Sequence, residues 1–237
     1  ARGLEKADLV LKDARIVNVF TEEIIRGDIA IQDGIIAGIG SFHGKEERDL
    51  AGRYVCPGFI DSHLHLESTL VTPAELVTAA SRHGTTTFIV DPHESANVSG
   101  LAGIDYILDQ TEDVKANVYV MMPSCVPATA IDDNGCTLTA EDMVPYLHNS
   151  RILGLGEVMD SISVVQGEKS MHDKLELFEG RIRDGHAPFL EEGDLQAYAM
   201  AGIATDHECS FFDYAMRERR NGLTILVREG SAARNLE

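Results

Sequence analysis

The sequence predicts an α/β protein, a (β/α)8 TIM-like barrel that lacks its eighth strand and follows a small β-rich N-terminal unit. From Tyr54 onward, short apolar runs alternate with helical patterns at intervals of roughly 20 to 35 residues, which is typical of βαβ units with a parallel sheet. The strand candidates are residues 55–61, 86–91, 117–122, 152–157, 182–186, 203–206 and 223–228. A complete barrel needs one more strand. The alternative is an open doubly wound sheet, although no phosphate-binding glycine fingerprint follows the first strand.

The first 55 residues differ in texture and predict a separate domain, with the barrel domain at residues 56–237. Short β-rich runs occupy residues 9–11, 15–20, 28–32 and 35–39. Asp33-Gly34 between the last two runs indicates a tight hairpin. We therefore expect a small antiparallel β unit, which is too small to close a core by itself.

Two helices of the barrel region carry clear local signals. Thr72-Pro73-Ala74-Glu75 has the spacing of a capping box with proline in the first turn, and Gly84 is suited to end that helix. Pro145 lies within residues 139–149 and should shorten or kink a helix there, because proline cannot donate the backbone hydrogen bond.

Composition excludes several classes of function. The net charge of -19 repels nucleic acid backbones and anionic membrane surfaces, so we expect neither as a partner. The 4 cysteines form no C-x-x-C pair, which favours a reduced, cytoplasmic location. No apolar run approaches the roughly 20 residues that a membrane helix needs.

The sequence His63-Leu64-His65 closes the first predicted strand. Residues i and i+2 of a strand point to the same side, so the two imidazoles can bind one metal ion together. Such pairs also arise by chance, and a metal site needs further ligands that converge on it.

Further candidate ligands fall at the carboxyl ends of later predicted strands. They are Asp91, His93 and Glu94 after the second strand, Glu157 at the fourth, His186 at the fifth and His207 at the sixth. Singly, each has an ordinary explanation, such as a buried ion pair, a core histidine or a helix cap. Their recurrence at strand ends favours one shared site, because these ends form one rim of a barrel. Imidazole and carboxylate suit zinc, iron or manganese, and their number predicts two metal ions with Glu157 as a bridge.

Several segments give the chain a resemblance to the amidohydrolase superfamily and, within it, to the adenine deaminase family. They are residues 57–68 (PGFIDSHLHLES), 84–87 (GTTT), 91–94 (DPHE), 123–128 (PSCVPA), 154–159 (GLGEVM), 184–188 (DGHAP) and 228–232 (REGSA). The first segment is shared across the superfamily, whereas the others together are much narrower. The resemblance covers essentially the whole chain.

The resemblance implies a site for two divalent metal ions, manganese, iron or zinc. His63 and His65 would hold one ion, His186 and His207 the second, and Glu157 would bridge them. Many relatives use a carboxylated lysine as the bridge, so a glutamate there favours adenine deaminases over dihydroorotases or hydantoinases. Asp91, His93 and Glu94 are the candidate catalytic residues, either orienting the metal ligands or handling protons. Ser124, Arg228 and Glu229 are near predicted strand ends and are the candidates for binding the purine edge.

The implied activity is hydrolytic deamination of adenine to hypoxanthine and ammonia by a metal-activated hydroxide, in a homo-oligomer whose substrate is a small purine. The N-terminal β unit would be part of a small β-sandwich domain completed by chain that follows the barrel. The superfamily has an essential aspartate after strand eight, so we expect this fragment to be inactive or feeble. Two alternatives stay open. One is another amidohydrolase, which would act on a cyclic amide or imide or a different aminopurine, and the other is a non-catalytic metal-binding relative.

Overall fold

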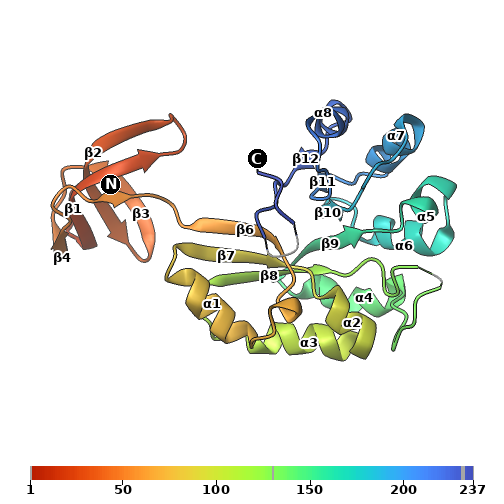
Figure 1. Cartoon of the computed structure of the whole chain (residues 1–237). Coiled ribbons are helices and arrows are strands. Elements are labelled where there is room, and N and C mark those ends of the chain that lie inside the picture. The colour runs from red at the N-terminus through yellow and green to blue at the C-terminus, as the bar shows by residue number, and fades with distance from the viewer. Residues whose placement is uncertain (1, 130, 231–232, 237) are drawn as a thin grey trace. The chain divides into compact units, whose positions relative to one another are not determined.

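The computed structural model describes residues 2–129, 131–230 and 233–236 (Figure 1). The chain divides into two compact units, Ala1–Gly58 and Phe59–Glu237. In the described part of the chain, no helix has both the length and the apolar character needed to cross a membrane.

The N-terminal unit is a mixed β-sheet. Its strands are β1 (Ala7–Asn18), β2 (Glu23–Gln32), β3 (Ile35–Gly40), β4 (Gly44–Asp49) and β5 (Tyr54–Val55). Strand β2 pairs antiparallel with β1 and β3, but β4 and β5 pair parallel with β1. The prediction of an antiparallel unit was therefore wrong in part. The mostly charged strand β4 gave no apolar signal from which its pairing could be inferred.

The expected hairpin of this unit is confirmed. Asp33 and Gly34 both have positive φ angles, 52° and 74°, and Gln32 lies opposite Ile35. This is the geometry that a two-residue turn between antiparallel strands requires. The first two predicted runs, residues 9–11 and 15–20, fall largely within one strand, β1, which is interrupted by a bulge near Asp13.

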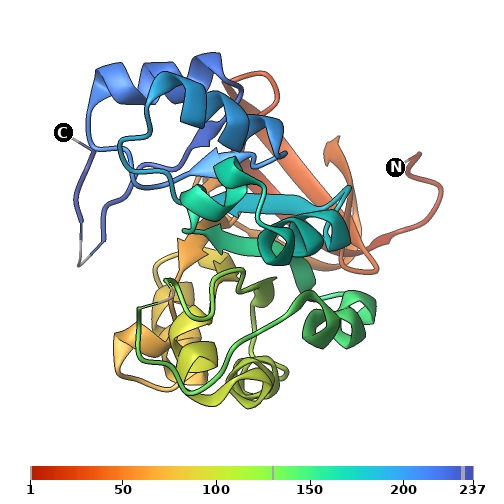
Figure 2. The same ribbon diagram turned by 90° about the vertical axis from the view of Figure 1, so that its right-hand side faces the viewer.

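The second unit contains a curved parallel sheet. Its strands are β6 (Phe59–Leu64), β7 (Thr85–Val90), β8 (Asn117–Met122), β9 (Ile152–Val158), β10 (Ile182–Gly185), β11 (Thr205–Asp206) and β12 (Thr224–Ile225). Strands β6 to β10 are neighbours in chain order, and β11 pairs with β12. A doubly wound sheet reverses its strand order at a switch point, so this sequential order matches part of a (β/α) barrel (Figures 1 and 2).

Helices connect these strands on the outer side of the sheet (Figure 1). They are α1 (Pro73–Ser81), α2 (His93–Ser99), α3 (Leu101–Gln110), α4 (Ala140–Met143), α5 (Ser161–Gln166), α6 (Lys169–Leu177), α7 (Glu192–Met200) and α8 (Phe212–Arg220), with short 3-10 turns η1 (Glu67–Thr69) and η2 (Val144–His148). Pro145 lies in the first turn of η2, directly after α4, which confirms that proline shortens this helix. Helix α1 begins at Pro73 as expected, although the Thr72 side chain makes no capping hydrogen bond.

The first barrel strand lies later than predicted. Residues 55–61 were expected to form it, but β6 begins at Phe59, and Tyr54–Val55 pairs with β1 of the N-terminal unit. Pro57 has no N–H to donate to a ladder, which separates the two segments. His63 consequently lies inside β6 and His65 directly after its end.

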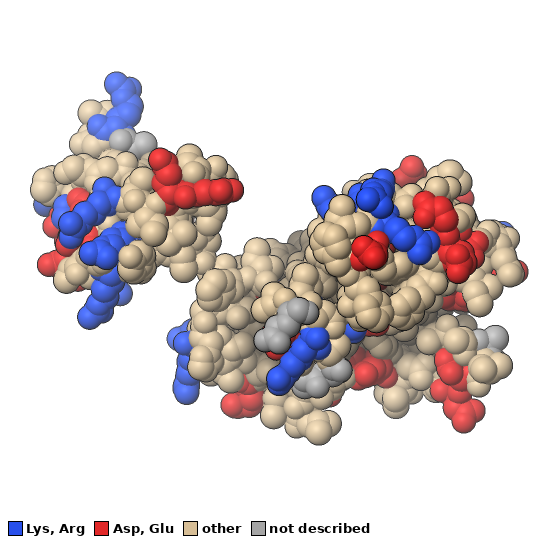
Figure 3. All heavy atoms as spheres, turned by 45° about the horizontal axis from the view of Figure 1, so that its top comes forward, with Lys and Arg blue, Asp and Glu red and all other residues tan. Residues whose placement is uncertain are grey.

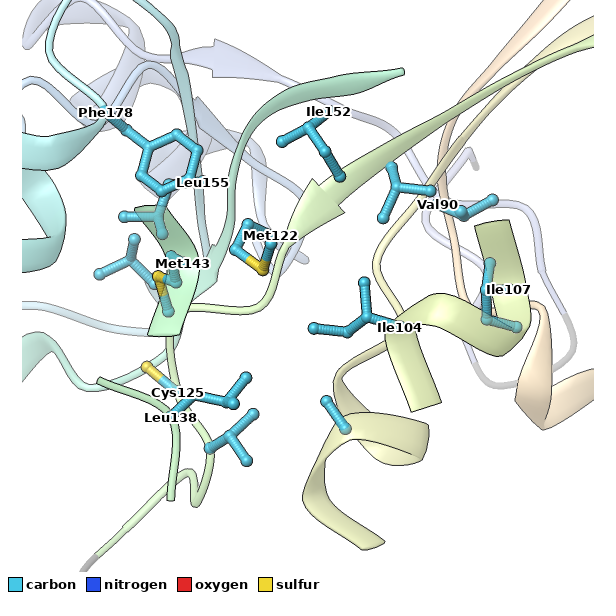
Figure 4. Close-up of a cluster of buried hydrophobic side chains, with 14 of the residues drawn as sticks. Val90, Ile104, Ile107, Met122, Cys125, Leu138, Met143, Ile152, Leu155 and Phe178 are labelled. Atoms are coloured by element: carbon cyan, nitrogen blue, oxygen red, sulfur yellow. The ribbon is translucent and has the colours of Figure 1, made fainter. Parts of the chain in front are cut away.

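A continuous apolar core lies between the sheet and its helices. Val90 and Met122 from the strands lie toward Ile104 and Ile107 of α3, Leu155 lies beside Phe178, and all of these residues are fully buried (Figure 4). On the surface, basic and acidic side chains are interspersed in the view of Figure 3. The sequences of the buried strands are runs of apolar residues because both faces of these strands are covered.

Gly103 allows helices α2 and α3 to pack closely. A Cβ atom at this position would lie 2.4 Å from the backbone oxygen of Ser95 in α2. Gly193 in α7 is the contrasting case, since a Cβ atom there would meet nothing within 4 Å. Because α2 begins at His93, the contact at Gly103 also affects the position of that side chain.

We expect Gly103→Ala and Gly193→Ala to have opposite effects on stability. The first should lower the free energy of unfolding by about 1–3 kcal/mol through the backbone clash. The second should raise it by about 0.4–1 kcal/mol, because alanine restricts the unfolded chain. Urea unfolding of the two variants measures both changes, and a stabilised Gly103→Ala protein would contradict this helix packing.

Candidate metal centre

The predicted ligands meet because of the strand order. Parallel neighbouring strands bring their carboxyl ends to one edge of the sheet. His63 and Glu157 lie near the ends of β6 and β9, while His186 and His207 directly follow β10 and β11. His65 follows β6 by one residue.

The Glu157 carboxylate is the centre of this group. Its Oε1 atom lies 2.6 Å from Nε2 of His207, 3.1 Å from Nε2 of His63, and 3.6 Å from both Nε2 of His65 and Nδ1 of His186. Glu157 is only 4% exposed. One buried carboxylate oxygen is thus surrounded by four imidazole nitrogens.

The donor atoms form two sets that fit divalent cations. His63, His65 and Glu157 form one set, Glu157, His186 and His207 form the other, and within each set the atoms lie within 4.8 Å of one another. Tetrahedral bonds of about 2.1 Å would separate neighbouring ligands by about 3.4 Å. The observed separations in the first set, 3.1, 3.2 and 3.6 Å, bracket that value. Nδ1 of His186 is buried with no hydrogen-bond partner among the described residues, so no such partner competes with a cation for this atom.

Contacts behind two of the imidazoles orient them toward Glu157. Nδ1 of His63 lies 2.8 Å from Oδ2 of Asp184, and Nδ1 of His65 lies 2.8 Å from the backbone oxygen of Asp91. Since both partners are acceptors, each Nδ1 donates a proton. In the neutral imidazole, each Nε2 would then have the lone pair, and this atom faces the site.

The buried charges shift the pKa values of this group strongly. Burial acts to lower the pKa of His63, but its contacts with Asp184 and Glu157 outweigh burial and raise that pKa to about 10. The same competition, with Glu157 as the main partner, raises the pKa of His65 to about 9. Burial acts to raise the pKa of Glu157, yet the imidazoles hold it well below its usual range. The site therefore attracts positive charge, either protons or the metal ions that compete with them.

The predicted catalytic residues divide into two groups. Asp91 is buried, and neither of its carboxylate oxygens has a hydrogen-bond partner among the described residues. His93 links it to the centre, with Nδ1 3.6 Å from Oδ1 of Asp91 and 3.2 Å from Oε2 of Glu157. Glu94 is exposed instead and accepts a hydrogen bond from the Ser68 hydroxyl.

The predicted substrate-binding residues do not converge on one pocket. Ser124 is buried, and its hydroxyl donates to the backbone oxygen of Glu157 at 2.6 Å. Both terminal nitrogens of Arg228 bond the Glu208 carboxylate. Glu229 is exposed, 3.6 Å from Arg234. Residues 231 and 232 of this motif lie outside the described part of the chain.

Sequence reasoning assigned no role to two acidic residues of the site, Glu208 and Asp184. Oε1 of Glu208 lies 3.7 Å from Nε2 of His207 and 3.9 Å from Nδ1 of His186. Strand alternation would place Glu208 opposite His207, but β11 ends at Asp206 and the chain then turns. Asp184, the partner of His63, lies only two residues before His186, and that proximity was the available signal.

Comparisons with known proteins agree with this fold and site. Residues 54–230 match the Amidohydrolase family, whose members are generally metal-dependent. The chain is 60% identical over 234 residues to an adenine deaminase of Desulfitobacterium hafniense, with 99% of this chain and 41% of that protein covered. It is 49% identical over 239 residues to an adenine deaminase of Clostridium acetobutylicum, with 100% of this chain and 42% of that protein covered.

A solved structure shares the fold. The β-aspartyl dipeptidase of Fervidobacterium islandicum superimposes with a TM-score of 0.61 at 15% identity, over 93% of this chain and 64% of that one. The chain spans about two fifths of the length of the two adenine deaminases. The chain belongs to the amidohydrolase family.

Proposed function

We propose that this chain is part of an adenine deaminase, which hydrolyses adenine to hypoxanthine and ammonia with two divalent metal ions. The observation that supports this most is the buried Glu157 carboxylate among four imidazoles from three different strand ends and one strand interior. The substrate is suggested by the two similar proteins named adenine deaminase. The alternative substrates, a cyclic amide or another aminopurine, are also compatible with the amidohydrolase family. Activity assays with each compound distinguish them from adenine.

The proposed ligand sets are two of the groups whose donor atoms lie within 4.8 Å of one another. His63 and His65 would hold one ion, His186 and His207 the other, and Glu157 both. Manganese, iron and zinc all accept imidazole and carboxylate ligands. When bound, such cations acidify water and polarise the atom under attack.

Asp91 and His93 are the proposed proton-transfer residues. Deamination at C6 consumes one water, and a proton must move from that water to the departing amine. Asp91 has two buried oxygens free to accept a proton, and His93 lies between it and Glu157. Glu94 would act at the periphery, where Ser68 holds its carboxylate.

The proposed substrate contacts involve Ser124, Arg228 and Glu229 in different ways. Arg228 would act through Glu208, which it holds beside His186 and His207. The Ser124 hydroxyl already donates to the backbone oxygen of Glu157, so its contribution to purine binding would be indirect. Glu229 has the most open position of the three.

We also propose the wider setting of the protein. Residues 1–55 would be part of a small β-sandwich domain, supported by the open five-stranded sheet. Residues 56–237 would be the hydrolase barrel. A cytoplasmic homo-oligomer that functions in purine salvage fits the unpaired cysteines and the acidic composition.

The proposed activity predicts ammonia release from adenine by the complete, metal-loaded protein. Glu157→Gln should lower kcat by more than about 100-fold and reduce bound metal, because even residues that only orient ligands cost 10–100-fold. Ammonia assay and metal analysis measure the two effects. Glu141→Gln, in an exposed carboxylate of α4, is the matched control and should change neither.

Two results would reject this assignment. If the protein turns over a cyclic imide but releases no ammonia from adenine, the proposed substrate is wrong, although the family assignment still holds. Metal content well below one ion per chain, or full activity in Glu157→Gln, would remove the proposed centre.

Removal of the metal ions should lower both activity and stability. A chelator should abolish ammonia release, and added divalent cation should restore it. An ion held at 100 times its dissociation constant stabilises the folded state by about 2.7 kcal/mol, so the unfolding midpoint should fall on chelation. Calorimetry with and without chelator measures this shift, and an unchanged midpoint would count against the site. Glu157→Gln should show a smaller shift than the unaltered protein.

Asp184→Asn should weaken metal binding although Asp184 is not a proposed ligand. The substitution keeps the size of the side chain but removes the charge that holds Nδ1 of His63. We expect a loss of about 10–100-fold in metal affinity, measured by titration of the metal-free protein. Asp173→Asn, on the surface of α6, controls for the loss of one negative charge. Equal affinity in both variants would show that Asp184 does not orient His63.

A further inference from the structure

The backbone around Glu157 is joined to its neighbours by side-chain hydroxyls where the β ladder becomes irregular. Between β9 and β10, the register shifts after Arg183, and the last pair is Gly185 with Val158. The residues directly beyond this pair are Met159, which follows Val158, and His186, which follows Gly185. A short ladder with a shifted register fixes the separation of two strand ends poorly.

Tyr198 of α7 spans this gap. Its hydroxyl donates to the backbone oxygen of Val158 at 2.6 Å and accepts from the backbone N–H of His186 at 2.9 Å. The residue is completely buried. One oxygen atom therefore replaces the missing ladder bond between the residue that follows Glu157 and His186 itself.

The environment of Tyr198 leaves the hydroxyl little choice of position. The ring packs in the main core, and a Cβ atom at Gly185 would lie 3.2 Å from its hydroxyl oxygen. A rigidly held hydroxyl with two backbone partners acts as a fixed spacer.

The opposite side of β9 has a comparable bond. The Ser124 hydroxyl, which follows β8, donates to the backbone oxygen of Glu157, and the buried Lys174 ammonium donates to the backbone oxygen of Ser124 at 2.7 Å. Glu157 and Val158 are thus each held by one hydroxyl. The Ser124 hydroxyl bonds only to Glu157 among the proposed ligands, whereas the Tyr198 hydroxyl connects Val158, next to Glu157, with the proposed ligand His186.

We propose that Tyr198 is a positioning residue, whose hydroxyl sets the separation between Glu157 and His186 and thereby the affinity of the second metal position. This rests on the proposed metal centre but not on adenine as the substrate. The hydroxyl touches neither metal nor substrate and acts through the two backbones.

Tyr198→Phe tests the proposal, because it keeps the ring and removes only the oxygen. In the complete protein, titration of the metal-free form with manganese should show a loss of about 10–100-fold in affinity for one of two ions. If adenine is the substrate, kcat should fall while its KM changes less than about twofold, since a spacer alters the chemistry more than the binding. Tyr146→Phe is the matched control, because its hydroxyl donates to Asp105 away from the centre, and its metal affinity should be unchanged.

Equal manganese affinity in Tyr198→Phe and the unaltered protein would overturn the proposal. Lack of turnover with adenine in the unaltered protein would instead reject the substrate and leave the metal titration valid. If Tyr198→Phe does not fold, hydrogen exchange in the unaltered protein decides. The His186 amide should then be protected as strongly as the ladder amide of Val120, and fast exchange of His186 would overturn the bridge.

Discussion

The burial of one carboxylate, that of Glu157, is the constraint on which the rest of the site depends. An ionised carboxylate away from water is costly unless charge and hydrogen bonds compensate it. Four imidazoles compensate it here, and they come from the ends of three strands, β6, β10 and β11. Parallel strands in sequential order bring these strand ends together. The charge balance of the centre therefore depends on the barrel topology.

The same constraint explains the glycines that flank Leu155 in β9. A Cβ atom at Gly156 would lie 2.2 Å from a carboxylate oxygen of Asp91, and one at Gly154 would lie 2.0 Å from the backbone oxygen of Ile182. The absence of a side chain at Gly156 lets Asp91, a second buried acid, approach the centre. The absence of one at Gly154 lets β10 pair closely with β9. The motif Gly-Leu-Gly-Glu therefore combines tight strand packing with the placement of two acids.

Sequence periodicity could predict that His63, His65, Glu157, His186 and His207 converge, because parallel strands place successive ends on one rim. It predicted the helix break at Pro145 and the hairpin at Asp33-Gly34 from local chemistry alone. It could not predict the start of β6, since the apolar run continues across Pro57 and only pairing partners show where each strand belongs. The position of Glu208 beside His207 could not be predicted for a related reason. The direction of its side chain is set by a turn after β11, not by strand alternation.

The supporting contacts show why such a site needs more than its ligands. Strands β10 and β11 are short, and regular ladder bonds alone give their ends little restraint. Side-chain groups provide restraint instead, from the Tyr198 hydroxyl on His186 to the Asp206 carboxylate, which accepts the backbone N–H of Ala187 at 2.6 Å. Each of these groups is buried and bonds to backbone, so its position is fixed by the core. The positions of the proposed metal ligands therefore depend on buried groups that are not themselves proposed ligands.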